Sequence, residues 1–459
     1  MQTSAAVDGE IDDSLLTLAR GGMARWSVPG VALGELDGPT RAIAGLGIAS
    51  LETGYATLPD SLFQIGSITK TYTATLVMML VEQGVIDLET PLIAWLPDLR
   101  LAEPATLKRL TLGMCLCHSG GFFGDYFEDF GPGDDALTRY IQHLDQVAQQ
   151  TPVGETWAYN NAGFCIVGAV IERVTGESFE QALRARLFQP LGLTRSFFFA
   201  RDAITYAVAI GHNQKKPGDD EHEVARPYLL PRAVNPAGGI ISNVADLLTF
   251  AEFHLNGGRT RDGHRLLSEE TVRAMWAPRI VAANFAESYA TGWDTRLIDG
   301  VQLVGHGGST NGFQARLTLI PDRHYAIAVL ANSSRGSALY REVIDARLAE
   351  RFNLRAPAPN YIKMTQAQLK RFAGVYNQPD GQVTLRATRN GLRREMVFRD
   401  SLTNKDWIYP PDDLRPIGPQ EFIVVTPGEN EGSRIDFLLN PDGSPRFLRM
   451  GGRLNERTM

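Results

Sequence analysis

A change of residue pattern near residue 355 limits this chain to folds that have at least two separately organised parts. The connector "NLRAPAPNY", residues 353–361, is rich in proline. Beyond it, short strand-like runs are separated by "QPDG", "TRNG" and "NPDG", which are typical of hairpin turns. We therefore predict a first domain over residues 1–355, a linker over 356–363, and a small antiparallel β-barrel or sandwich over 364–459.

The first domain has strand-like runs near both of its ends and helices between them. A helical pattern over 12–26 precedes strand-like runs at 28–36 and 41–50. The middle of the domain is mainly helical, with long loops at 122–135 and 213–227. Strands return at 301–308, 313–321 and 324–332, and a helix is expected over 338–352. The pattern indicates an α+β domain.

Composition excludes several classes of function. Hydrophobic residues make up 44% and charged residues 21% of the chain, which is typical of a globular protein. The net charge is −7 and there is no basic run, so a nucleic-acid partner is not expected. No apolar run is long enough for a transmembrane helix. Acidic residues occupy the N-terminal positions where a signal peptide would be apolar, so we expect a cytoplasmic protein without a membrane partner.

The cysteine content argues against a disulfide framework. The chain has three cysteines, an odd number in a long sequence. A metal site built from Cys115, Cys117 and His118 is an alternative, but their spacing is poor for zinc. Small buried thiols are the preferred interpretation.

The stretch "FQIGSITKTYTATLVMML", residues 63–80, places a serine and a lysine at the head of an apolar run. The apolar spacing predicts an amphipathic helix. Ser67 and Lys70 are three residues apart, so they share one helix face and the lysine amine can reach the serine hydroxyl. Lys70 could then act as a base toward Ser67 as a nucleophile. In the alternative interpretation, Ser67 only caps the helix and Lys70 extends to solvent.

Two further stretches have both a functional and a structural interpretation. Tyr159-Asn160-Asn161 precedes a helix expected over 162–174, where the asparagine could cap the helix and the tyrosine could anchor packing. His306-Gly307-Gly308 interrupts a strand-like run. Glycines there indicate a bulge or a close backbone approach, and a single histidine is more often structural than catalytic.

Taken in order, "FQIGSITK", "YNN" and "HGG" resemble the three motifs of the penicillin-recognising serine hydrolases, in the branch of class C β-lactamases, DD-peptidases, D-aminopeptidases and family VIII esterases. The resemblance covers about residues 10–350 and extends to "CHSGGF", "NPAGGIISNVADLLTFAEFHLNGG" and "VIERVTGESFEQALRARLFQPLGLTRSFF". It implies a β-lactamase-like fold, with an antiparallel sheet flanked by helices and a mainly helical subdomain. The tail resembles the lipocalin-like barrel of some D-aminopeptidase-like members and of stand-alone peptide cyclases.

The resemblance implies catalytic roles for the first two motifs. Ser67 is expected to be the nucleophile that forms an acyl-enzyme. Lys70 and Tyr159 are expected to share the role of base in one hydrogen-bond network. Either group needs a shifted pKa for this role, because a lysine must be neutral and a tyrosine must be ionised to accept a proton.

The same resemblance assigns the binding residues. Asn161 is expected to hydrogen-bond the substrate amide and Lys70. The backbone N–H groups of Ser67 and Ser309 are expected to form the oxyanion hole. Gly307 and Gly308 would let the substrate backbone approach the strand, beside His306. No metal and no organic cofactor is expected.

His306 stands where β-lactamases of this group have a lysine. A neutral imidazole is a weaker partner for the carboxylate of a β-lactam than an ammonium. The preferred function is therefore a serine hydrolase of small amides or esters, similar to a D-aminopeptidase or an esterase. A peptide cyclase or transacylase that uses the same acyl-enzyme, a β-lactamase, and a catalytically silent binding protein remain alternatives. The expected partner is a small-molecule or peptide substrate.

Overall fold

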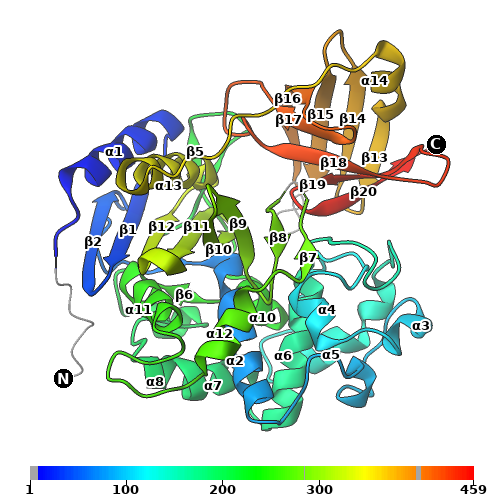
Figure 1. The fold of residues 1–459 in the computed structure, drawn as a ribbon. Helices are drawn as coiled ribbons and strands as arrows, with labels where there is room; N and C mark the ends of the chain where they lie inside the picture. The colour runs from blue at the N-terminus through cyan, green and yellow to red at the C-terminus, as the bar shows by residue number, and fades with distance from the viewer. Residues whose placement is uncertain (1–8, 284, 400–404, 459) are drawn as a thin grey trace.

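The computed structural model describes residues 9–283, 285–399 and 405–458. Its first part is built on one antiparallel sheet of eight strands (Figure 1). In spatial order the strands are β2 (Thr40–Gly47), β1 (Gly30–Asp37), β12 (Tyr325–Ala331), β11 (Phe313–Ile320), β10 (Val301–Thr310), β9 (Asp294–Ile298), β8 (Ser288–Tyr289) and β7 (Ile280–Val281). Strand β1, from the beginning of this part, pairs with β12, from its end, one strand in from the β2 edge of the sheet.

Helices cover both faces of this sheet, and each face has its own hydrophobic core. Helices α1 (Asp13–Trp26) and α13 (Gly336–Phe352) pack together against one face. Helix α11 (Val244–Leu255) packs against the other. Helix α2 (Thr69–Glu82) belongs to the same core as α11, and twelve of its residues are buried. An apolar helix of this kind must be enclosed on all sides.

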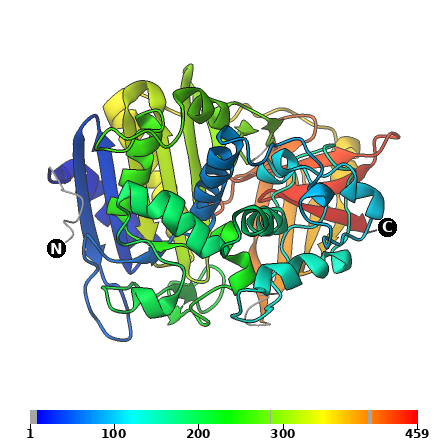
Figure 2. The same cartoon turned by 90° about the horizontal axis from the view of Figure 1, so that it is seen from below.

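A mainly helical subdomain lies on the far side of α2 from the sheet (Figure 2). Its central helix, α6 (Asn161–Thr175), is buried over its first eleven residues and packs against α2 and its neighbours. The other helices of the first part are α3 (Pro104–Leu107), α4 (Leu112–Leu116), α5 (Ala136–Gln142), α7 (Phe179–Leu183), α8 (Gln189–Leu191), α9 (Ala200–Ala203), α10 (Asn235–Gly238) and α12 (Glu269–Trp276).

Two local expectations differ from the structure. The spacing of "SFEQALRARLFQPLGL" predicts one helix over 178–193, but a π-helical turn, Arg184–Phe188, divides the segment into α7 and α8. The loop expected over 213–227 contains a small hairpin, β4 (His212–Gln214) with β5 (His222–Val224). A second pair joins β3 (Phe63–Gln64) to β6 (Ile241–Ser242). Short pairs of this kind depend on their surroundings, so a single-sequence pattern does not reveal them.

The last part is a closed antiparallel barrel of eight strands, preceded by helix α14 (Gln366–Phe372). Its strands are β13 (Gly374–Gln378), β14 (Gly381–Ala387), β15 (Leu392–Arg399), β16 (Asp406–Pro416), β17 (Glu421–Val424), β18 (Arg434–Leu439), β19 (Pro445–Met450) and β20 (Arg453–Thr458). Alternate residues point into a separate hydrophobic core, as in Val383, Leu385 and Leu392. The predicted fold class, a β-lactamase-like α+β fold followed by a β-barrel, is confirmed.

The structure also bears on the expectations about membrane helices, cysteines and metal sites. Within the described ranges, no helix has both the length and the apolar character needed to cross a membrane. All three cysteines are buried and free, as predicted. The described residues contain no cluster of three or more side chains suited to a metal ion. Residues 1–8, which the expected first domain and the N-terminal argument both include, lie outside the described residues.

Candidate active site

Ser67 lies in a 3₁₀ turn, Gly66–Ile68, that leads directly into α2. Gly66 has a φ of +51°, and a Cβ there would lie 2.6 Å from the backbone nitrogen of Ser309 at the end of β10. A side chain is therefore excluded, both by the backbone conformation and by the close approach of the strand. The glycine before Ser67 brings the serine backbone and the Ser309 backbone together.

Lys70 is buried in the first turn of α2 with 0% exposure. Its Nζ lies 2.9 Å from Ser67 Oγ, 2.6 Å from Asn161 Oδ1 and 2.7 Å from the carbonyl oxygen of Ala237. Burial holds the pKa of Lys70 well below its usual range, and the charge of Arg453 lowers it further. The lowered pKa favours the neutral form of the amine.

The contacts of a neutral Lys70 can be assigned from the chemistry of its partners. The Asn161 side chain is oriented by its Nδ2, which donates to Asp125 at 2.5 Å and leaves Oδ1 facing the amine. Asn161 Oδ1 and the Ala237 carbonyl can only accept hydrogen bonds. Two N–H bonds of a neutral amine satisfy them, and its lone pair then faces the Ser67 hydroxyl. This arrangement aims a base at the serine proton.

Tyr159 and Asn161 enter the site from the start of α6. Asn160 caps that helix through its side-chain oxygen, which accepts from the Gly163 N–H. Lys70 Nζ lies 5.0 Å from the centre of the Tyr159 ring. Burial raises the pKa of Tyr159 above its usual value, although Arg453 and a hydrogen bond with the Ser67 side chain oppose the shift. The phenol is therefore neutral at pH 7.

His306 of β10 is buried, and both of its ring nitrogens have partners. Nδ1 lies 2.5 Å from the Gly307 carbonyl oxygen and Nε2 lies 2.7 Å from Tyr289 Oη. A carbonyl only accepts, so Nδ1 carries the proton and Nε2 accepts from the tyrosine. Burial lowers the pKa of His306 to about 3. The ring is neutral, and no cation stands at this position of the strand.

The structure thus brings all the sequence-predicted site residues to one place, where β10, the Ser67 turn and the start of α6 meet. Gly308 lies directly against the Ser67 turn, because a Cβ there would lie 1.9 Å from the Ile65 carbonyl oxygen. The sequence analysis missed Ala237, Asp125, Tyr289 and Arg453. Asp125, Tyr289 and Arg453 belong to no motif noted in the sequence, and Ala237 lies in the "NPAGGIISNVADLLTFAEFHLNGG" stretch, which by itself assigns it no role. Each reaches the site only through the tertiary fold.

The site opens into a cleft of about 1700 Å³ between the two parts of the chain. Ser67, Tyr159 and His306 lie in its wall on the side of the first part. The barrel contributes residues from its strands, including Met396, Trp407 and Arg453. The cleft that leads to Ser67 is therefore lined by both parts of the chain.

Comparisons with known proteins agree with this architecture. A family model described as Beta-lactamase matches residues 16–352. Penicillin-binding protein 4 of Amycolatopsis lactamdurans is 34% identical over 335 residues, which cover 72% of this chain and 87% of that protein. Unguisins hydrolase ungD' of Aspergillus campestris is 28% identical over 488 residues, which cover 95% of this chain and 89% of that protein. A crystal structure of SurE, 25% identical, has a TM-score of 0.74 and covers 97% of this chain and 98% of its own.

Proposed function

Because the chain belongs to the β-lactamase family of serine hydrolases, we propose that it cleaves amide or ester bonds through an acyl-enzyme at Ser67. The observation that carries this proposal is the buried Lys70 amine, 2.9 Å from Ser67 Oγ and surrounded by partners that only accept. A serine hydroxyl is a weak nucleophile unless a base takes its proton. Lys70 Nζ lies within hydrogen-bond distance of the hydroxyl, and its lowered pKa favours the neutral form that this role requires.

The proposed reaction begins when Ser67 Oγ attacks the substrate carbonyl carbon and its proton passes to Lys70 Nζ. The developing oxyanion accepts hydrogen bonds from the backbone N–H groups of Ser67 and Ser309. Tyr159, a neutral phenol beside Ser67, relays a proton to the leaving nitrogen or oxygen, and is reprotonated from Lys70. In the second step water attacks the ester carbon, the same groups remove its proton, and Ser67 leaves with a proton restored.

For the substrate, we propose an amide in a peptide or a small ester in preference to a β-lactam. A neutral His306 provides no cation for a β-lactam carboxylate. A cleft of about 1700 Å³ exceeds the volume of about 300–1000 Å³ usual for small-molecule pockets. The similarity to an unguisins hydrolase, which extends over 95% of this chain, also favours hydrolysis over transfer to another acceptor.

Transacylation is a second candidate, favoured by the same large cleft. A peptide acyl group on Ser67 would have room to present its own amine to the ester carbon in place of water. The bond that forms would then be an amide, and the product would be a cyclic peptide. Incubation with a peptidyl thioester and mass analysis of the product distinguish the two, because hydrolysis adds the mass of one water to the released acyl group.

The proposal is tested by intact-protein mass spectrometry after exposure to a fluorophosphonate, p-nitrophenyl esters, and D- and L-amino-acid amides. We expect a covalent adduct on the wild type, none on Ser67→Ala, and turnover that is lost together with the adduct. Ser444→Ala, in a barrel turn outside the cleft lining, is the matched serine control and should be labelled like the wild type. Equal labelling of Ser67→Ala would overturn the proposal.

A further inference from the structure

The turn between β19 and β20 of the barrel is inserted against the Tyr159 segment. The Tyr159 N–H donates to the Gly452 carbonyl oxygen at 2.8 Å. Gly452 has a φ of +81°, and a Cβ there would lie 2.7 Å from the Trp157 ring and 2.9 Å from Tyr159 Cβ. Arg449 of β19 donates to the Trp157 carbonyl oxygen at 2.8 Å. Only glycine permits this approach, so the turn is shaped to fit the wall of the candidate site.

Arg453, the first residue of β20, continues this contact into the polar network of the site. Its Nε lies 2.8 Å and its Nη2 3.3 Å from the two carboxylate oxygens of Asp125. Its guanidinium carbon lies 4.5 Å from the centre of the Tyr159 ring. Asp125 also accepts from Asn161 Nδ2, and Asn161 Oδ1 accepts from Lys70. One chain of contacts therefore links the barrel to the lysine, and a second links it to the tyrosine.

We propose that Arg453, with Asp125 as its partner, is a positioning residue of the active site that the barrel supplies to the first domain. It holds the Tyr159 ring by stacking on it, and it holds the Asn161 amide through the Asp125 carboxylate. The fork of a guanidinium fits both tasks, because it bonds a carboxylate bidentately and stacks on an aromatic ring. The inference rests on the proposed function and deepens it.

The charges of Arg453 and Asp125 have opposite effects on the pKa values of Lys70 and Tyr159, the two groups proposed to handle the serine proton. After burial, the cation of Arg453 lowers the pKa of Lys70 and opposes the rise in the pKa of Tyr159. The Asp125 carboxylate raises the pKa of both groups. The other titratable groups facing Lys70 are Cys165 of α6, His118 of the loop after α4, and His306 of β10. Those facing Tyr159 include Asp294 of β9 and Tyr289 of β8.

The test is the pH dependence of the rate at which a fluorophosphonate labels Ser67. The acid limb of the profile is the pH range in which Lys70 becomes protonated and the rate falls. Arg453→Gln removes a cation that lowers the pKa of Lys70, so this limb should move to higher pH. The labelling rate at pH 7 should also fall, by up to about 100-fold, because the ring and the amide lose their support. Asp125→Asn should move the acid limb to lower pH. A purely structural role would lower the rate equally at every pH and shift neither limb.

Two further variants make the result decisive. Arg453→Lys keeps the cation but not the fork, so it should keep the wild-type limb with an intermediate rate. Arg393→Gln removes an exposed arginine elsewhere on the barrel and should match the wild type in rate and profile. A cooperative thermal unfolding transition, measured for every variant, checks that each is folded.

The outcomes separate the two proposals. If the wild type is not labelled at Ser67, the proposed function itself is contradicted. The other outcomes assume that the wild type is labelled. If the acid limb of Arg453→Gln is then unchanged, or if Arg453→Gln behaves like Arg393→Gln, only the inference about the barrel is overturned. Opposite shifts in Arg453→Gln and Asp125→Asn support it.

Discussion

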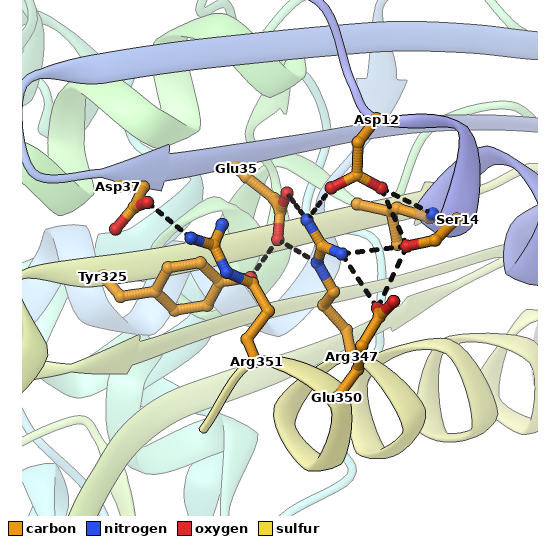
Figure 3. A network of polar contacts seen from close by, with 9 residues as sticks. Asp12, Ser14, Glu35, Asp37, Tyr325, Arg347, Glu350 and Arg351 are labelled. Carbon is orange, nitrogen blue, oxygen red and sulfur yellow. Dashed lines mark hydrogen bonds and ion pairs between the residues drawn. The ribbon is translucent and has the colours of Figure 1, made fainter. Parts of the chain in front are cut away.

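Two buried basic side chains in this chain, Arg347 and Lys70, have opposite surroundings. Arg347 of α13 is 3% exposed and forms a bidentate pair with Glu35 of β1, with N–O distances of 2.7 and 2.8 Å. Asp12 and Glu350 add further ion pairs to it (Figure 3). Lys70 is 0% exposed, and its three hydrogen-bond partners in the described part of the chain are all uncharged.

The difference appears in the protonation of the two groups. Burial disfavours both charges, but hydrogen bonds with Glu35 and Asp12 hold the pKa of Arg347 above its usual value. No carboxylate contacts the Lys70 amine within the described ranges, and its pKa falls. The compensated cation of Arg347 joins α1, α13 and the sheet, whereas the uncompensated amine of Lys70 favours the neutral form that the proposed base requires. Stability and reactivity are thus assigned to different places in the same domain.

The largest expected effect is that of Lys70→Met on the reaction. We expect the rate of Ser67 labelling to fall by about 10²–10⁴-fold, the usual contribution of a general base. The free energy of unfolding should change by less than about 2 kcal/mol, because the lost hydrogen bonds are offset by removal of a costly buried amine. Labelling kinetics and urea unfolding measure the two quantities. A loss of stability without a loss of rate would contradict the comparison.

Arg347→Met should have the reverse effect. Removing one partner leaves Glu35 buried without its cation, which costs about 3–5 kcal/mol of unfolding free energy. The labelling rate of the folded protein should stay at the wild-type value, since Arg347 does not contact the site. The double variant Arg347→Met with Glu35→Gln removes the orphaned charge and should recover part of the loss. A double variant as unstable as the single one argues against charge compensation.

Acid should weaken the Arg347 cluster through Asp12. Burial opposes ionisation, but hydrogen bonds from the Leu15 N–H, Arg347 and Ser14 lower the pKa of Asp12 to about 2. Its unfolded value is about 3.9, so its contribution is present above about pH 4 and is lost as the pH falls through 2. Asp12→Asn keeps a good helix cap. The variant should lose about 1 kcal/mol at pH 7 and show a weaker pH dependence of urea unfolding between pH 4 and 2.

Arg351→Gln should have the smallest effect. Arg351 pairs with Asp37 at 2.6 Å, but both side chains are partly exposed, at 31% and 46%. An ion pair in contact with water contributes little, so the expected loss of unfolding free energy is less than about 0.5 kcal/mol. A loss as large as that of Arg347→Met would show that burial does not separate the two arginines.

Spacing along single elements predicted a large share of the fold and of the site. Ser67 and Lys70 lie on one helix face, because residues three apart on a helix are neighbours. Strands at the two ends of the first domain also followed from their short apolar runs, and they pair in the sheet as β1 and β12. The placement of Tyr159 and His306 beside Lys70 rested on the resemblance to a family, because no local pattern connects segments so far apart in sequence.

The sequence by itself determined which residues are candidates for the proposed chemistry, because the hydroxyl, the amine, the phenol and their local elements depend on neighbours along the chain. Only the tertiary structure decided the protonation and the contacts of these groups. It buries Lys70 among oxygen atoms that accept hydrogen bonds, it engages both nitrogens of His306, and it brings Arg453 from the barrel onto Tyr159. A pKa depends on solvent exclusion and on charges that are distant in sequence, so it becomes defined only when the two parts of the chain are packed together.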